Sequence, residues 1–157
     1  MRHQELVRQH AILKSLIKRT GHGPSTRDLE MLGHWGRYLC VLTSGFVENA
    51  VREILSQYTR ASASPAVSRY AIRHIDDIRN PKAGRLVEIM SSFDSRWGRE
   101  LEDFLQDNFR GDAVNSIMQN RHLIAHGRNS NITVGQVDQC LTRIVEIVDL
   151  LERQCGI

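Results

Sequence analysis

The stretch TVGQVDQCLTRIVEIVDLL, residues 133–151, has the clearest periodic pattern in the chain. Its main apolar residues recur in steps of three and four, at Val134, Val137, Leu141, Ile144, Val148 and Leu151. This spacing places them on one face of an α-helix, and Thr133 with Gln136 has the spacing of a capping box that begins a helix. The stripe is widened by Cys140, Val145, Ile147 and Leu150. So wide a stripe predicts a helix that packs into its own bundle and is also a candidate oligomer interface.

Upstream of this helix, apolar residues keep helical spacing nearly everywhere, and no run of alternating β-branched residues is long enough to predict a sheet. A first helix is predicted to end near Thr20, before the breaker sequence of residues 21–24. Ser25 or Thr26 can cap a second, long core helix over residues 29–58. The fold class is therefore predicted to be all-α.

Shorter helices follow the long one. We predict them over residues 66–79, 82–92 and 94–108. Asp112 is a good cap for a further helix that runs to about His126. Gly127 can adopt the left-handed conformation that ends such a helix, and residues 128–131 then form a loop.

Size and composition indicate one ordinary intracellular domain. A chain of 157 residues buries enough surface to fold without a disulfide or a structural metal. Its three cysteines, Cys40, Cys140 and Cys155, lie far apart within apolar helical patterns, which predicts reduced, buried thiols. No stretch approaches the run of about 18 apolar residues that a membrane span requires, so we expect a soluble protein of the cytoplasm.

Positive charge is concentrated at one end of the chain. The net charge is +3, but residues 1–27 hold six basic residues and one acidic residue, a balance of +5, which leaves the rest at −2. We therefore divide the chain into a basic N-terminal helical extension, residues 1–24, and a helical bundle, residues 25–157. The extension can gather phosphates by counterion release, and a solvated helix face is the equally good alternative.

Arg121 and His126, with four residues between them, form the motif with the strongest chemical interest. Similar spacings recur at Arg27/His34 and Arg69/His74. Context separates the three pairs, because Arg69 is followed by Tyr70 and Arg27 opens a helix. Arg121 is followed by the polar His122, in a helix predicted to end at a glycine, Gly127. Spacing alone is weak evidence, and this context is what favours the Arg121 pair.

The sequence Asn120-Arg121-His122-Leu123-Ile124-Ala125-His126-Gly127 resembles the signature of HEPN domains, in which arginine is followed by a polar residue and, a few residues later, by histidine. Its position, at the end of the penultimate helix and before a long last helix, is also that of the family. Residues 45–52, GFVENAVR, look like the family's early core helix, and the resemblance extends loosely over residues 29–155. It implies an antiparallel helical bundle of HEPN type, here with an additional N-terminal helix.

Catalytic HEPN proteins are understood as metal-independent ribonucleases, and the residue types suit that chemistry. Histidine exchanges a proton near neutral pH, and arginine offers a planar fork of donors to a phosphate that gains charge in the transition state. The resemblance implies His126 as general acid or base, Arg121 as the phosphate clamp and His122 as the orienting polar neighbour. No cofactor or metal is expected, since the other histidines lack ligand spacing with Asp, Glu or Cys.

One chain is a poor active site by itself. On an ideal helix His122 and His126 share a face, whereas Arg121 lies about 140° from His126. The family is thought to solve this with a twofold dimer that brings two motifs together, so we expect a homodimer with a composite site. As substrate-binding residues we predict Asn120, Glu48, Arg52 and Arg128, although a salt-bridged helix position is the alternative for Glu48.

The function predicted from the sequence is thus endoribonucleolytic cleavage of RNA by a soluble homodimer. By analogy with the family, the protein is a toxin or defence component with an antitoxin or other protein partner. One alternative is a non-catalytic HEPN module that binds nucleotide, RNA or protein. Another is a structural bundle whose motif is incidental, because a histidine followed by glycine is also ordinary helix-ending chemistry.

Overall fold

The computed structural model describes residues 1–21 and 29–157, and the predicted cap at Ser25 or Thr26 lies outside these residues. Within them it has seven helices and no strand, which confirms the all-α prediction. The helices are α1 (Gln4–Gly21), α2 (Leu29–Ser62), α3 (Pro65–Asp76), α4 (Ala83–Phe93), α5 (Ser95–Gln106), α6 (Arg110–Ala125) and α7 (Val134–Gln154).

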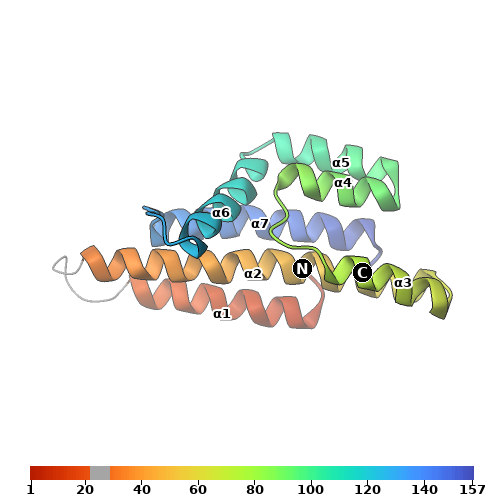
Figure 1. The fold of residues 1–157 in the computed structure, drawn as a ribbon, viewed down its shortest axis with the longest axis horizontal. Helices are drawn as coiled ribbons and strands as arrows, with labels where there is room; N and C mark the ends of the chain where they lie inside the picture. Colours follow the sequence, from red (N-terminus) through yellow and green to blue (C-terminus); the bar gives the residue numbers. More distant parts are fainter. Residues whose placement is uncertain (22–28) are drawn as a thin grey trace.

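Three long helices, α1, α2 and α7, lie side by side along the length of the molecule (Figure 1). α4, α5 and α6 lie on one side of them, and α3 packs at the C-terminal end of α2. α1 runs antiparallel to α7, since Lys14 Nζ donates to Asp138 Oδ1 at 2.6 Å near one end and the Met1 ammonium pairs with Asp149 near the other. α2 and α7 run in the same direction (Figure 1). α6 leaves the α4–α5 pair and descends across α2 and α7.

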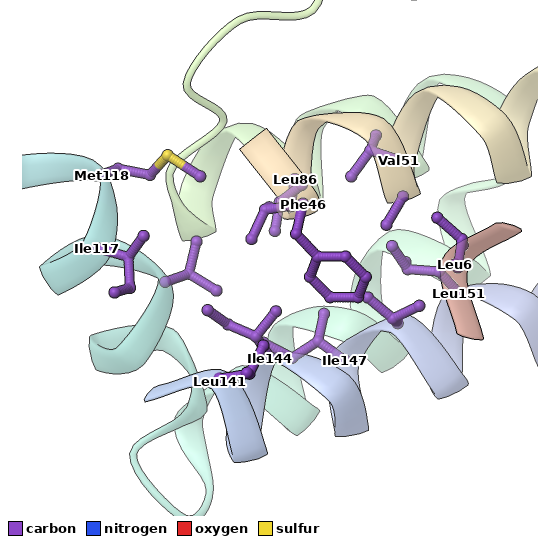
Figure 2. Close-up of a cluster of buried hydrophobic side chains, with 14 of the residues drawn as sticks. Leu6, Phe46, Val51, Leu86, Ile117, Met118, Leu141, Ile144, Ile147 and Leu151 are labelled. Atoms are coloured by element: carbon purple, nitrogen blue, oxygen red, sulfur yellow. The ribbon is translucent and has the colours of Figure 1, made fainter. Parts of the chain in front are cut away.

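The predicted stripe of α7 forms the middle of the core. Val137, Leu141, Ile144, Val148 and Leu151 are all buried, and Figure 2 shows several of them facing Phe46 of α2 and Ile117 of α6. The capping box of Thr133 and Gln136 is also present. Because α1, α2, α5 and α6 all contact α7, the width of its stripe is accounted for within one chain. That width is therefore no evidence for a subunit interface.

α1 is packed into the same core as the rest of the bundle. Leu6, Leu13 and Ile17 are buried along one side of this helix. Its basic residues lie outside, where Arg8 pairs with Glu5 and Lys14 with Asp138. The basic first helix thus contributes apolar surface to the bundle as well as charge.

Several predicted boundaries differ from the structure, among them the end of α2, which runs to Ser62 instead of residue 58. α6 begins at Arg110 rather than after Asp112, and its N-cap is Phe109 in a left-handed conformation with φ of 57°. Asp112 instead lies in the first turn of α6, where a carboxylate still favours the positive end of the helix dipole. α3 ends at Asp76 instead of residue 79, and a connection that contains Asn80, with φ of 44°, leads to α4.

The loop before α7 packs directly on the backbone of α2 at Gly36. A Cβ atom built on Gly36 would lie 2.2 Å from the carbonyl oxygen of Ile132, far inside contact distance. The other atoms close to that position also belong to the backbone of the loop, at Ile132 and Thr133. Only glycine permits this approach, which fixes the loop between α6 and α7 against α2.

Substitution of Gly36 tests this contact. We expect Gly36→Ala to lower the free energy of unfolding by about 1–3 kcal/mol, because the backbone of the loop must move away from the new methyl group. Gly45→Ala is the matched control in the same helix, where a Cβ meets nothing within 4 Å. It should raise stability by about 0.5–1 kcal/mol. Urea unfolding followed by circular dichroism measures both, and equal effects would contradict the close approach.

Candidate functional site

The end of α6 carries the predicted motif and closes in a Schellman motif. His126 is the C-cap, and Gly127 follows with φ of 64°, as its position in the sequence predicts. The Gly127 N–H donates to the Ile124 carbonyl at 3.1 Å, and the Arg128 N–H donates to the Leu123 carbonyl at 2.9 Å. These bonds satisfy carbonyls that a helix end leaves unpaired, and they fix the backbone from which His126 projects.

The two histidines of the motif meet at this helix end. His122 and His126 are both exposed, and their ring centroids lie 4.4 Å apart with the planes tilted by 59°. The spacing of four residues places the rings on one face of α6, as the sequence predicts. The chain therefore offers two solvent-accessible imidazoles, in mutual contact, at a fixed backbone position.

Arg121 is half-buried on another side of α6, close to α2. Its guanidinium forms no hydrogen bond or ion pair with any residue that the structure describes. Nearby, the Cys40 thiol of α2 donates to the Ile117 carbonyl at 3.5 Å, and burial raises the pKa of this thiol to about 12. Cys40 is therefore a packing residue, whereas the charge of Arg121 remains available to a ligand.

Acidic residues are missing from this part of the chain. Between Ala113 and Val137 the sequence has no aspartate or glutamate, and Arg121 and Arg128 are its only formal charges. The segment thus carries +2, with two histidines that add charge when protonated. A polyanion that approaches the end of α6 meets no opposing carboxylate from this segment.

Asn120, predicted as a substrate contact, is used within the chain. Its side-chain oxygen accepts from the Ser130 hydroxyl at 2.8 Å, and its Nδ2 donates to the Ser116 carbonyl at 2.9 Å. Ser130 is itself buried, with 4% of its surface exposed. Asn120 therefore holds the loop after the motif to α6. Sequence alone does not single out Ser130, because a serine in a polar loop gives no sign of being buried.

Glu48 and Arg52 are also committed to internal contacts. The Arg52 Nη2 donates to Glu48 Oε2 at 3.2 Å, and its Nε donates to the Ile78 carbonyl at 3.0 Å. Glu48 Oε1 accepts from the Asn80 N–H at 2.6 Å. This pair, with the i,i+4 spacing of a helix salt bridge, holds the connection between α3 and α4. No contact joins it to Arg121, His122 or His126, and Arg128 lies exposed beside the motif.

Residues 1–21 and 29–157 were also considered for a metal site and for a membrane-spanning helix. No group of three or more His, Cys, Asp or Glu residues in these ranges is arranged to hold a metal ion. No helix in the same ranges combines the length and the apolar character needed to cross a membrane. Cys40, Cys140 and Cys155 are free thiols, of which Cys40 and Cys155 are buried.

Comparison with known proteins identifies a family that this chain matches over nearly its whole length. A family model described as RiboL-PSP-HEPN matches residues 4–156. The matched range begins at α1, so the family pattern includes the basic first helix as well as the region of the motif. Neither the curated proteins nor the solved structures include a significant match.

The hydrogen bond between Asn120 and Ser130 predicts a stability effect. Asn120→Ala and Ser130→Ala should each lower the free energy of unfolding by about 1–2 kcal/mol, because each leaves the other partner buried without its bond. The double variant should lose less than the sum of the single losses. Asn129→Ala, at an exposed neighbouring position, is the control. Additive losses in chemical unfolding would show that the two side chains act independently.

Proposed function

The chain belongs to the RiboL-PSP-HEPN family, and from this premise we propose that it is a metal-independent endoribonuclease whose site is built from Arg121, His122 and His126. The observation that carries the proposal is the contact of two exposed imidazoles at the end of α6, beside an arginine with no acidic partner. The absence of acidic residues from 113–137 supports it, because the substrate is a polyanion.

The proposed reaction is an attack by a ribose 2′-hydroxyl on the adjacent phosphorus. His126 accepts the hydroxyl proton, the new P–O bond forms, and the bond to the 5′-oxygen breaks. The leaving 5′-oxygen takes a proton from water, and His126 returns its proton to solvent, which leaves a cyclic 2′,3′-phosphate and a 5′-hydroxyl. Arg121 donates to the non-bridging oxygens as their negative charge grows. His122, in ring contact with His126 at 4.4 Å, fixes the orientation of the catalytic imidazole.

A second subunit is part of the proposal because one chain separates the required groups. Arg121 makes no hydrogen bond to either histidine, and helix geometry places it about 140° around α6 from His126. A twofold axis near the end of α6 brings the arginine of one subunit toward the histidines of the other. We therefore propose a homodimer because a single chain does not bring Arg121 and the two histidines together.

The cellular setting of the proposal follows from the family alone. We propose RNA as the substrate, the cytoplasm as the compartment, and a toxin or defence role with a neutralising antitoxin or other protein partner. Within this proposal Asn120 supports the backbone of the site through Ser130, whereas Glu48 and Arg52 hold the connection between α3 and α4. Arg128, exposed and next to the motif, remains the proposed additional contact to RNA phosphates.

Substitution of the motif tests the nuclease. We expect His126→Ala to reduce cleavage of single-stranded RNA by about 100-fold or more, because the proton acceptor is lost. Arg121→Ala should lose about 100-fold, and Arg121→Lys should recover little, since lysine lacks the bidentate fork. Cleavage by the wild-type protein should persist in excess chelator. Product sizes on a denaturing gel give the rates.

Arg69 and His74 are the matched controls, because they have the same spacing, lie exposed on α3 and are remote from any helix end with a glycine cap. Their alanine variants should cleave RNA at the wild-type rate. Unchanged cleavage by His126→Ala would eliminate the nuclease proposal. RNA or nucleotide binding without cleavage, lost on Arg121→Ala, would instead indicate a non-catalytic HEPN module.

The shared site predicts interference between subunits. When a large excess of the Arg121→Ala/His126→Ala double variant exchanges with wild-type protein, most wild-type chains pair with a subunit that supplies neither group, so both sites of the mixed dimer are incomplete. Activity per wild-type chain should then fall well below its starting value. An excess of His74→Ala protein is the control and should not lower it. If activity per wild-type chain is unchanged by either addition, the site does not depend on two motifs.

A further inference from the structure

A groove of about 400 Å³, lined by polar and apolar atoms in about equal measure, lies between α6 and α7, and the two histidines do not line it. α6 lines it with residues such as Phe109, Asp112 and Asn120. The opposite side includes Asn131, Gln139 and Arg143. The groove runs from the first turn of α6 to the loop that follows the motif. Neither Arg121 nor His126 lines this groove.

Phe109, at the end of the groove next to the start of α6, is unusual in two ways. Its side chain is 70% exposed, and its φ of 57° is a conformation that a bulky side chain rarely adopts. No ring or cation contacts it among the described residues. Phe104, five residues earlier, shows the ordinary arrangement, with the Arg110 guanidinium 3.9 Å from its ring centroid. Phe109 therefore presents an open aromatic face to solvent at a backbone cost.

Arg143 of α7 holds the turn that presents this ring. Its Nε donates to the carbonyl of Asn108 at 2.9 Å, and its Nη1 donates to the Gln139 carbonyl at 3.3 Å. Asn108 is also left-handed, with φ of 54°. Arg143 has no carboxylate partner within the described part of the chain. Its positive charge is therefore fixed in the groove beside Phe109, with Nη2 still free to donate.

The remaining groups determine what the groove can accept. Asp112, one turn after Phe109, disfavours a phosphate at that end but can accept from the amino group of a base. Asn131 and Gln139 are exposed amides without side-chain partners in the described residues. At the other end of the groove, the hydrogen bond between Asn120 and Ser130 connects α6 to the loop that follows the motif. Ring, cation and amides together match a nucleotide chain better than an apolar ligand.

We propose that this groove binds a single-stranded segment of the RNA, with a base stacked on Phe109 and an adjacent phosphate on Arg143. The inference rests on the proposed function for its choice of ligand, and it adds a substrate-binding site away from the reacting groups. Only unpaired bases can stack on an exposed ring, so the groove selects single strands over duplexes. A strand held there continues around the end of α6 toward His126.

The first test measures binding rather than cleavage. A short fluorescein-labelled single-stranded RNA of mixed sequence is titrated with full-length protein that carries His126→Ala, and anisotropy gives Kd. Phe109→Gly should raise Kd by roughly 5- to 100-fold, the range expected for loss of one stacked base. Phe109→Trp should retain binding. Tyr70→Ala, which removes another ring that is 69% exposed, on α3, should leave Kd unchanged.

Phe109→Gly also separates binding from folding. Glycine tolerates a positive φ, and the ring it replaces is mostly exposed, so Tm should stay equal or rise while RNA binding falls. An unlabelled duplex of the same sequence should compete poorly with the labelled single strand. Strong competition by the duplex would overturn the stacking mode.

The phosphate contact has its own signature in the salt dependence of binding. Arg143→Gln should make the slope of log Kd against log salt less steep by about 0.7, the value for one phosphate of a single strand. Phe109→Gly should leave the slope as it is. Arg60→Gln, at an exposed position on α2, is the matched control for loss of one charge.

These experiments can overturn the groove proposal and the nuclease proposal independently of each other. Equal RNA binding by Phe109→Gly and its parent would overturn the groove as a site, and the nuclease proposal would stand on cleavage alone. Weaker binding with no cleavage by wild type would support the groove and defeat the nuclease. If Phe109→Gly abolished dimer formation or the binding of another protein while RNA binding stayed intact, the groove would be a protein-binding site. That outcome would overturn the proposal.

Discussion

Burial of α7 is the interaction on which the other features depend. Its apolar face is enclosed by α1, α2 and α6, and each fully buried side chain such as Leu141 or Ile144 contributes about 1.5–3 kcal/mol. Because α7 lies in the middle of the core, the loop that leads into it packs against the backbone of α2 at Gly36. The end of α6, joined to the same loop, is thereby given a fixed place. The geometry of the motif follows from core packing.

The candidate site combines a fixed backbone with free side chains. The Schellman motif and the bond from Ser130 to Asn120 hold the chain on both sides of His126. In contrast, His122 and His126 are exposed, and Arg121 has no acidic partner. Functional groups placed in this way meet a substrate without reorganisation of the backbone, which is the arrangement that lowers the barrier of a positioned reaction. In the proposed homodimer, the second chain supplies the groups that complete the site.

Sequence could predict the features that depend on local pattern. The period of α7, its capping box, the left-handed Gly127 and the shared face of the two histidines all follow from residues near one another in the chain. Features that depend on contacts between residues far apart in the chain could not be predicted from the sequence. The bond of Asn120 to Ser130 and that of Glu48 to the Asn80 N–H depend on tertiary packing. The start of α6 was predicted wrongly because Phe109 accepts a left-handed φ that its side chain disfavours.

Charge distribution favours the end of α6 over the N-terminal segment as the place where the proposed RNA substrate approaches. The basic residues of the N-terminal segment look like the obvious attraction for phosphates, yet Arg8 and Lys14 are paired with Glu5 and Asp138. Paired charges at a surface add little to the long-range field, because each cation is offset by a neighbouring anion. The segment of residues 113–137, by contrast, has two arginines and no acid. Its two positive charges are therefore not offset by any acid in the same segment, and they lie at the end of α6 beside the imidazoles.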